Sequence, residues 1–527
     1  MISWSAGPNE MTANDMLAVE TPASLIGHPR QEQQLRIASQ DAQGHRVLSD
    51  RKRWFLDSLL IICLLLMVAA KSIIPAASMD EDLWWHVSTG RWILSHHTVP
   101  THDPFPTSSM GSSWIAYTWL FDVISSKTYD TWGLHGILTM TTLLTLGFVV
   151  AVVVLLSRQA RMVRATVLSA LVFTASASLI SPRPWLFTCN FAVAELYFLL
   201  QAHERGKVVW LAPILPLFAV WANLHIQFVY GLGLIGLFAL ERPLTALLKW
   251  DPPETALRSR HLWALLAGSI LATLVNPYGW RIYEVVAQYA TETAPLQFVQ
   301  EMQPMQFRSV TDWAAFFLAC LAVFTIARSG RRCFLMISLL VVSFWFGFRT
   351  GRDVWFLSLV SALVIAYATR SSEPGLRKIR CAQWAIVLPA SLGLAFAVLG
   401  APGVSAGALQ QAVEKRFPEK ASAYIQDHSL QGPLYNPYGW GGYLIWRLPH
   451  MALSIDGRAN LYGDARLTRF FMTWSGHRDW AEDTELRKAK TILLERDNPL
   501  ASILSSDSRF RLVYEDDVAS VFQPVLK

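Results

Sequence analysis

Long apolar segments alternate with short polar ones over most of the chain, and this pattern predicts a bundle of membrane-spanning helices. A span needs about 17–25 mostly apolar residues. About eleven segments approach this requirement, several of them only with flanking residues: 54–74, 132–156, 165–180, 185–202, 209–223, 228–240, 262–275, 313–326, 334–348, 354–368 and 384–400. A further segment at 114–124 contains Asp122, which suits a helix lying in the membrane interface.

Polar sequence stands on both sides of this block. Residues 1–53 contain no apolar run, so they predict a disordered cytoplasmic tail rather than a signal peptide. From 401 to 527 charges become frequent, and a segment of this length suffices for one small α/β domain. Its strand-like runs are 432–435, 443–446, 452–455, 491–494, 511–514 and 519–522, and its helix-like pieces are 414–427 and 481–488.

Basic residues predict the orientation of the helices. Arg51, Lys52 and Arg53 directly precede the first span, and the loops on the same side carry most of the other arginines and lysines. Because positive residues are enriched in cytoplasmic loops, the N-terminus is expected inside the cell. An odd number of spans then places residues 401–527 outside. We therefore expect a protein of the bacterial inner membrane with a periplasmic C-terminal domain.

The composition narrows the class of protein. Hydrophobic residues make up 53% of the 527 residues and charged residues only 16%, against roughly 25% in ordinary soluble domains. The net charge of +6 follows from the topology signal, so no nucleic-acid partner is expected. The five cysteines are isolated from one another, which argues against a zinc site or a disulfide framework.

The segment after the first span carries the most chemistry. Asp80, Glu81 and Asp82 precede Trp84, Trp85 and His86, and three adjacent carboxylates at a membrane boundary are costly. One acid can act as a general base, or Asp80 and Asp82 can hold Mg²⁺ or Mn²⁺ against a phosphate. The tryptophans can stack on a sugar face. An acidic helix cap beside an aromatic belt is the structural alternative.

Further polar residues stand at the other outer turns. Arg183, Arg349 and Arg352 lie on the predicted outer side, against the topology signal, and guanidinium groups bind phosphate in a bidentate manner. We expect them to bind a lipid phosphate, with snorkelling or a structural ion pair as the alternative. His86 and His225 can bind substrate or act as bases, although structural histidines are more common at such positions.

The order of these motifs resembles the first outer loop of the GT-C membrane glycosyltransferases. The acidic motif is followed by Gly-Arg-Trp-Ile at 90–93, a Pro/Asp turn at 100–104 and Trp-Ile-Ala-Tyr-Thr-Trp-Leu at 114–120. This superfamily includes protein O-mannosyltransferases, the aminoarabinose transferases of lipid A and the catalytic subunits of oligosaccharyltransferases. The resemblance implies a GT-C-like membrane domain at 54–400 with a catalytic outer loop at 75–131. It makes Asp80 or Asp82 the candidate base, with Glu81 beside them.

The same resemblance implies a reaction. GT-C enzymes transfer a sugar from a polyprenyl-phosphate or polyprenyl-diphosphate donor, so such a donor and the membrane lipid are the expected partners. Oligosaccharyltransferases complete a metal site with a second acidic motif between the third and fourth spans. This chain has Ser-Pro-Arg-Pro-Trp at 181–185 instead. A divalent cation is therefore in doubt, and a metal-free mechanism, as suggested for the aminoarabinose-transferase branch, remains open.

One motif of the C-terminal domain also resembles a GT-C element. Residues 440–443 read Trp-Gly-Gly-Tyr, loosely similar to the Trp-Trp-Asp-Tyr-Gly element that helps oligosaccharyltransferases bind an acceptor. Trp440 and Tyr443 are therefore candidate substrate-binding residues. The structural alternative is a tight turn between two core strands.

The leading interpretation is a membrane glycosyltransferase that acts on the outer face. Alternatives are a lipid-linked glycan flippase or another transporter, a scaffold for envelope polysaccharide assembly, and a polymerase or ligase of similar layout. Polar residues collect at the outer boundary rather than in the middle of spans, which favours chemistry on one face. The acceptor can be a protein, a lipid or a polysaccharide.

Overall fold

The computed structural model describes residues 52, 54–71, 80–253, 255–331, 333–370 and 404–525, with eight isolated positions between 385 and 400. Nearly all of the predicted tail at 1–53, residues 72–79 and most of the predicted span at 384–400 lie outside the described residues. The chain divides into two units, residues 1–58 and 59–527. The second unit contains the remaining membrane helices and the C-terminal domain.

Six described helices are long and apolar enough to cross a membrane: Trp54–Lys71, α3 (Trp119–Leu156), α5 (Trp185–Arg205), α7 (Phe228–Leu247), α11 (Val310–Ser329) and Gly351–Ala368, which includes α13 (Val354–Ala368). Shorter apolar helices are α4 (Met162–Ala175), Val208–Leu224, which includes α6 (Ile214–Leu224), and α12 (Phe334–Arg349). α8 (Ser259–Thr273) is a further helix of similar length. Each predicted span between 54 and 368 coincides with one of these helices. The predicted polytopic helical architecture is therefore confirmed.

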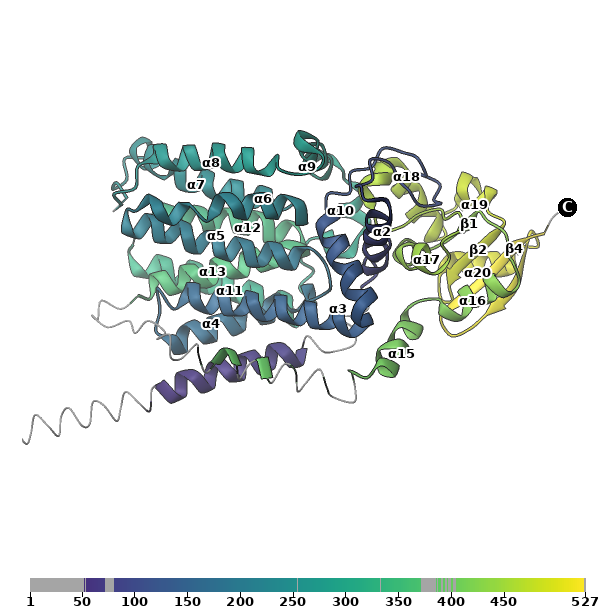
Figure 1. The fold of residues 1–527 in the computed structure, drawn as a ribbon, viewed down its shortest axis with the longest axis horizontal. Coiled ribbons are helices and arrows are strands. Elements are labelled where there is room, and N and C mark those ends of the chain that lie inside the picture. The colour runs from purple at the N-terminus through teal and green to yellow at the C-terminus, as the bar shows by residue number, and fades with distance from the viewer. Residues whose placement is uncertain are drawn as a thin grey trace, which may run out of the picture. The chain divides into compact units, whose positions relative to one another are not determined.

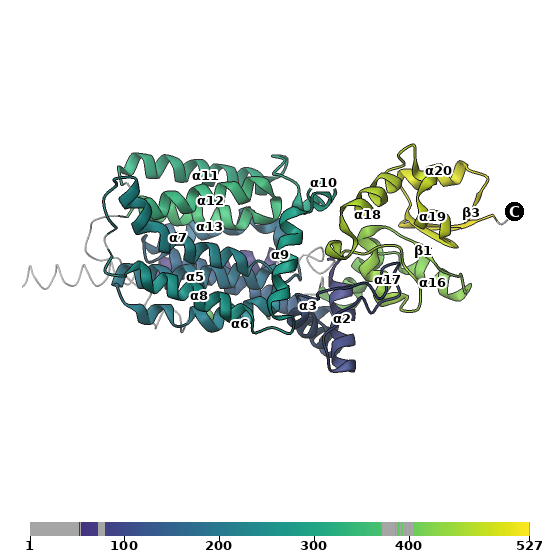
Figure 2. The same cartoon turned by 90° about the horizontal axis from the view of Figure 1, so that it is seen from above.

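The helices α4–α8 and α11–α13 lie side by side in a bundle (Figures 1 and 2). α13 packs against α4, α11 and α12, and every residue from Val354 to Ile365 is buried. A helix that is apolar on all sides is expected at the centre of a membrane bundle. Its N-terminal end carries the charged turn Gly351–Asp353 to the edge of the bundle.

The segment after the first span forms α2 (Leu83–His96), which packs along the first part of α3. α3 begins at Trp119 and bends at Gly133, whose φ of 61° lies in the left-handed region. The helix expected at 114–124 begins only at Trp119, and Asp122 is fully buried in the contact with α2. A Cβ atom on Gly90 would lie 2.1 Å from the carbonyl oxygen of Asp122, so this contact requires glycine.

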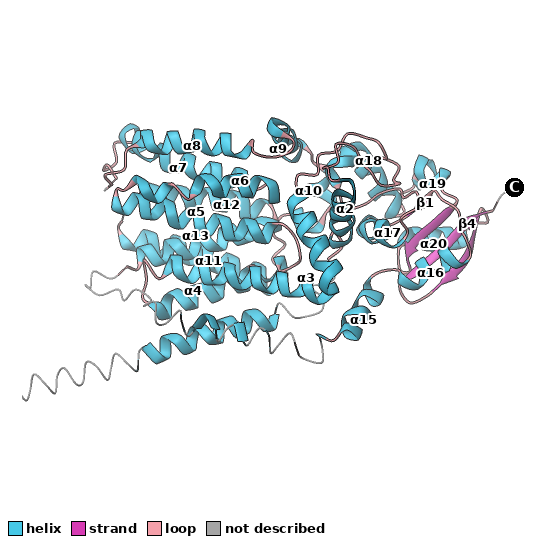
Figure 3. Cartoon of the chain, in the orientation of Figure 1, coloured by secondary structure: helices cyan, strands magenta, loops and turns pink. Residues whose placement is uncertain are grey.

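The segment between α8 and α11 contains α9 (Ile282–Thr291), α10 (Ala294–Phe298) and a short 3-10 helix, Gln300–Met302. After residue 404 follow α15 (Ala406–Arg416), α16 (Glu419–Asp427), β1 (Leu434–Tyr435), α17 (Gly441–Arg447), α18 (Ala459–Trp474), α19 (Thr484–Lys488), β2 (Thr491–Glu495), α20 (Pro499–Ser506), β3 (Phe510–Glu515) and β4 (Ala519–Pro524). The strands form one sheet in the order β1-β2-β4-β3 (Figure 3). β1 and β2 are parallel, and the other neighbours are antiparallel.

The predicted α/β character of the C-terminal domain is confirmed, but two of its predicted strands were wrong. The run at 443–446 belongs to α17, because a short apolar run carries no periodicity that separates a strand from a buried helix. The run at 452–455 forms only isolated bridges, from Leu453 to Thr107 and to Leu434. The first of these bridges joins the C-terminal domain to the outer loop.

The close contact of α2 and α3 generates a stability prediction. Gly90→Ala should destabilise the protein by about 1–3 kcal/mol, because the new methyl group forces the helices apart. The measurement is the thermal unfolding midpoint of the detergent-solubilised protein. Gly236→Ala in α7 is the matched control, since a Cβ there meets no atom within 4 Å. Equal midpoints for the two variants would contradict the prediction.

Candidate functional site

A cavity of about 660 Å³ lies where the predicted outer loop, one end of the helix bundle and the C-terminal domain meet. Charged side chains on its wall come from separate parts of the sequence: Asp80, Glu81, Asp82, Arg183, Glu301, Arg308, Asp312, Arg352, Arg416 and Arg458. Its aromatic lining consists of Trp85, Trp114, Tyr117, Trp185, Tyr289 and Tyr438. Such a mixture of charges and ring faces suits a ligand that has both an anionic group and a sugar.

The acidic motif is organised around one guanidinium group. The backbone N–H of Asp82 donates to Asp80 Oδ1 at 2.9 Å, and this turn brings both carboxylates to the same side. Arg183 Nε donates to Asp80 Oδ1 and Oδ2 at 2.8 and 2.7 Å. Arg183 Nη1 lies 2.8 Å from both Asp82 Oδ2 and Glu301 Oε1. Asp82 stands at the N-cap of α2, but its side chain makes no capping hydrogen bond.

A second arginine approaches the same centre from the start of α13. Arg352 Nη2 donates to Glu301 Oε1, and the Arg352 guanidinium carbon lies 5.5 Å from the centroid of the Trp185 ring. The guanidinium carbon of Arg183 lies 4.8 Å from the centroid of the same ring. Arg352 Nε is buried and has no hydrogen-bond partner. This N–H is therefore a donor that a ligand in the cavity can satisfy.

Two of the acids have pKa values shifted in opposite directions. Burial raises the pKa of Asp82 to about 7, although Arg183 opposes the shift, and Asp80 and Glu301 add to it. Burial also acts to raise the pKa of Glu301, but Arg183 and Arg352 outweigh it and lower that pKa to about 2. Near neutral pH, Asp82 can therefore exchange a proton while Glu301 stays ionised. Separated pKa values of this kind distinguish acid–base groups from purely electrostatic ones.

Glu81 points to the C-terminal domain. Its Oε1 accepts a hydrogen bond from Arg416 Nη2 at 2.9 Å. Burial raises the pKa of Glu81, and Arg416 partly offsets this. The side chain thus links the acidic motif to the end of α15.

The two predicted histidines both line the cavity. His86 Nδ1 lies 2.5 Å from Asp122 Oδ1, and the imidazole lies over the ring of Trp85 with a centroid distance of 3.6 Å. Burial and the nearby Arg183 lower the pKa of His86, so the neutral ring predominates. His225 Nδ1 lies 2.8 Å from Thr188 Oγ1. Fixed neutral rings of this kind can accept or donate a hydrogen bond to a substrate hydroxyl.

Glycines allow the C-terminal domain to approach the acids. A Cβ atom on Gly457 would lie 2.1 Å from Asp82 Oδ1, and one on Gly439 would lie 2.5 Å from Glu81 Oε2. A Cβ on Gly442 would lie 2.8 Å from the carbonyl oxygen of Glu81. Gly439, Gly442 and Gly457 therefore act by their lack of a side chain.

The structure separates the predicted site residues into two groups. Asp80, Glu81, Asp82, Trp85, His86, Arg183, His225 and Arg352 line the cavity. Trp84, Arg349, Trp440 and Tyr443 do not. Arg349 is exposed at the end of α12.

The three aromatic residues of the second group have the contacts of core residues. Trp84 packs edge-on against Tyr129, Phe417 and Tyr443. Trp440 Nε1 donates to the carbonyl oxygen of Arg416 at 3.1 Å. Tyr443 is fully buried, so its aromatic character serves the packing of α17 on α2. The motif is a helix start rather than the tight turn between strands.

Glu301 is the main site residue that sequence reasoning missed. It lies in a 3-10 helix within the long segment between α8 and α11, surrounded by glutamine and methionine. The signal that could have identified Glu301 is the presence of an acidic residue on the predicted outer side. Nothing in its neighbourhood indicates that it meets Arg183, which lies 118 positions away in the sequence.

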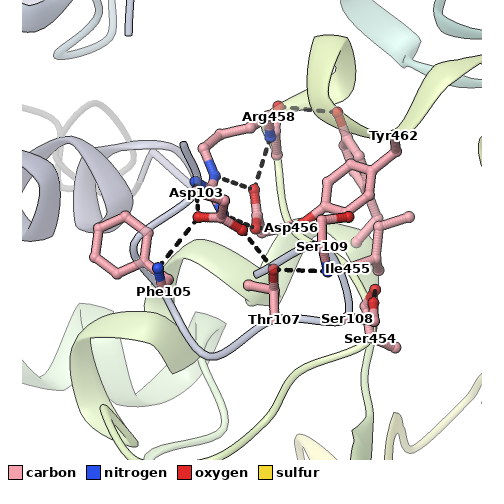
Figure 4. Close-up of polar contacts among 12 residues, drawn as sticks. Asp103, Phe105, Thr107, Ser108, Ser109, Ser454, Ile455, Asp456, Arg458 and Tyr462 are labelled. Carbon is pink, nitrogen blue, oxygen red and sulfur yellow. Dashed lines mark hydrogen bonds and ion pairs between the residues drawn. The ribbon is translucent and has the colours of Figure 1, made fainter. Parts of the chain in front are cut away.

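A buried ion cluster joins the outer loop to the C-terminal domain beside the cavity (Figure 4). Arg458 Nη1 donates to Asp103 Oδ1 at 2.7 Å, and Arg458 Nε and Nη2 donate to the two oxygens of Asp456 at 2.8 and 2.7 Å. The guanidinium group lies over the rings of Phe105 and Trp114. Both acids and the arginine are almost fully buried, so this cluster fixes the wall that carries Gly457.

Comparison with solved structures finds several similar chains, among them those of two proteins, an oligosaccharyltransferase and ArnT. The oligosaccharyltransferase of Archaeoglobus fulgidus, solved with a tethered acceptor peptide containing the NVT sequon, matches with a TM-score of 0.52 and 13% identity, over 83% of this chain and 69% of that chain. ArnT of Cupriavidus metallidurans, solved with undecaprenyl phosphate, matches with a TM-score of 0.44 and 14% identity, over 89% of this chain and 98% of that chain. No protein-family model and no curated protein sequence matches. The predicted fold is confirmed, because the chain is similar in fold to the oligosaccharyltransferase, one of the enzymes whose first outer loop it resembles.

The buried ion cluster generates a second stability prediction. Arg458→Met should cost about 3–5 kcal/mol, because it leaves the carboxylates of Asp103 and Asp456 buried without their cation. The readout is the unfolding midpoint in detergent. Arg478→Met is the control, since the Arg478 side chain is 86% exposed and lies 3.7 Å from its acidic partner. An Arg458 variant as stable as this control would show that the cluster does not hold the two parts together.

Proposed function

We propose that the protein is a GT-C-type glycosyltransferase that moves a sugar from a polyprenyl-phosphate or polyprenyl-diphosphate donor to an acceptor on the outer face of the membrane. One observation carries the proposal. A carboxyl group with a pKa near 7, Asp82, lies 2.8 Å from a buried arginine in an aromatic-lined cavity at the end of the helix bundle. The cavity thereby combines a proton acceptor, a cationic partner for phosphate and aromatic surfaces for a sugar.

The proposed reaction uses Asp82 as the general base. Its ionised carboxylate takes the proton of an acceptor hydroxyl or amine as that atom attacks the anomeric carbon of the sugar. The bond from the anomeric carbon to the phosphate oxygen breaks, and the electron pair leaves with the phosphate. Attack opposite the leaving group inverts the anomeric carbon. Asp80 holds Arg183 in position through two hydrogen bonds.

The two arginines stabilise the departing phosphate. Arg352 offers its unpartnered Nε–H, and Arg183 adds positive charge close to the base. Charged donors aimed at developing negative charge are a major source of transition-state stabilisation. Trp85, Trp114 and Trp185 supply ring faces for the sugar.

Transport is the competing function. A flippase needs polar groups along a path through the bilayer. The charged groups of the cavity instead come from the outer loop, from inter-helix turns and from the C-terminal domain. This one-sided arrangement supports chemistry at one membrane face. The same geometry supports placing the cavity and the C-terminal domain on the periplasmic side of a bacterial inner membrane.

A transfer assay tests the proposed base. Labelled sugar on polyprenyl-phosphate donors is incubated with membranes that contain the wild type, Asp80→Asn, Asp82→Asn or the double variant. We expect Asp82→Asn to lower the rate by about 10²–10⁴-fold, the range for a general base. Asp80→Asn should have a smaller effect, because it acts through Arg183.

Asp479→Asn is the control, since the Asp479 side chain is 57% exposed and outside the cavity. Immunoblots of the membranes check that all variants accumulate to the same level. Transfer at the wild-type rate by the double variant would refute the assignment of the base and favour a transporter or scaffold.

The pKa shifts predict a specific pH dependence. Asp82 must be ionised to act as base, so kcat/KM should fall about tenfold per pH unit below about pH 7. Glu301→Gln removes a negative charge that raises the pKa of Asp82 and leaves Arg183 free to stabilise the carboxylate. The acid limb of the profile should therefore move to lower pH. Glu284→Gln, at an exposed carboxylate paired with Arg281, should leave the limb unchanged. A shift to higher pH in Glu301→Gln would contradict the assignment.

A further inference from the structure

Three carboxylates of the cavity converge on one positively charged group. Asp80, Asp82 and Glu301 come from two distant segments, and their side chains all point to one centre. Mg²⁺ and Mn²⁺ prefer carboxylate and water oxygens, and clusters of acids often bind one of them. The resemblance to oligosaccharyltransferases raises the same expectation.

The centre is taken by a side chain of the protein itself. Arg183 Nε donates hydrogen bonds to both carboxylate oxygens of Asp80. Arg183 Nη1 lies 2.8 Å from a carboxylate oxygen of Asp82 and 2.8 Å from one of Glu301. A cation bound at the same point would have to displace the guanidinium group from all three partners. The described residues contain no group of three or more histidine, cysteine, aspartate or glutamate side chains that could hold a metal. The residues present therefore do not fit a divalent cation.

Arg183 is also held in place from other directions. Its guanidinium lies over the Trp185 ring, and the side chain is only 14% exposed. Arg352 neutralises the remaining charge of Glu301. Moving Arg183 aside would leave a buried guanidinium without partners, which is strongly unfavourable. Arg183 is thus a fixed component of the site.

We infer that the guanidinium group of Arg183 replaces the divalent cation in this site, so that the protein neither binds nor requires Mg²⁺ or Mn²⁺ there. The ion pairs exist without any substrate, so metal binding can be measured independently of the proposed glycosyl transfer. The consequence for activity rests on the proposed function. There a fixed positive charge beside the base takes over the electrostatic role of a metal ion.

Mn²⁺ binding tests the inference directly. Full-length protein in detergent is treated with EDTA, desalted and titrated with Mn²⁺, and free Mn²⁺ is followed by electron paramagnetic resonance. The wild type should show no saturable site. Arg183→Ala frees the three carboxylates to rearrange around a cation and should show one saturable Mn²⁺ site per chain, at least roughly tenfold tighter than the non-saturating binding of the wild type. Glu301→Gln in the Arg183→Ala background should abolish the new site.

Arg281→Ala is the matched control, since it removes an exposed arginine whose ion pair is with the single carboxylate of Glu284. Arg183→Met serves the same purpose as Arg183→Ala if the smaller side chain prevents folding, as judged by size-exclusion elution. One tightly bound Mn²⁺ in the wild type overturns the inference. So does the lack of any new site in a folded Arg183 variant.

The transfer assay separates this inference from the proposed function. With EDTA, the wild-type rate should stay within about twofold of the rate with added Mg²⁺ or Mn²⁺. Loss of transfer in EDTA with recovery on Mn²⁺ addition overturns the metal-free site but supports the enzyme. Absence of transfer under all conditions refutes the function, while the Mn²⁺ titration still decides the occupant of the site.

Discussion

The site depends on the pairing of Arg183 with three carboxylates at the end of a membrane helix bundle. Ionised groups removed from water are costly, and the cost is recovered only when each finds opposite charge with good hydrogen-bond geometry. Here Asp80, Asp82 and Glu301 share one guanidinium, with Arg352 behind it. This pairing ties the outer loop to the turn before α5 and to the segment before α11. The cavity has its shape because these three segments meet at one point.

The same pairing divides the chemical roles of the acids. Glu301 contacts both arginines and keeps its negative charge, whereas Asp82 faces two other acids and only one arginine. Burial, together with the excess of acids over arginines, raises the pKa of Asp82 to about 7, and a general base requires a pKa in this range. Electrostatic imbalance within the cluster is therefore part of the proposed mechanism.

The C-terminal domain completes the cavity through backbone rather than through reactive side chains. At Gly439, Gly442 and Gly457 the main chain lies so close to Glu81 and Asp82 that a Cβ atom would clash with them. The buried cluster of Asp103, Asp456 and Arg458 holds that main chain in place. Trp440 and Tyr443, which resemble an acceptor-binding element, support this wall from within the core.

The sequence alone determined the helical membrane architecture, because the bilayer imposes a length and an apolarity that each span must meet locally. It also located the acidic motif and Arg183, since charges at a membrane boundary are conspicuous against an apolar background. Which charges meet was decided only by tertiary structure. Glu301 and Arg183 are 118 positions apart, and nothing near either residue specifies the other. Likewise, Trp85 and Trp84 are neighbours, but only the packing of α2 places one at the cavity and the other in the core, because successive residues of a helix face different sides.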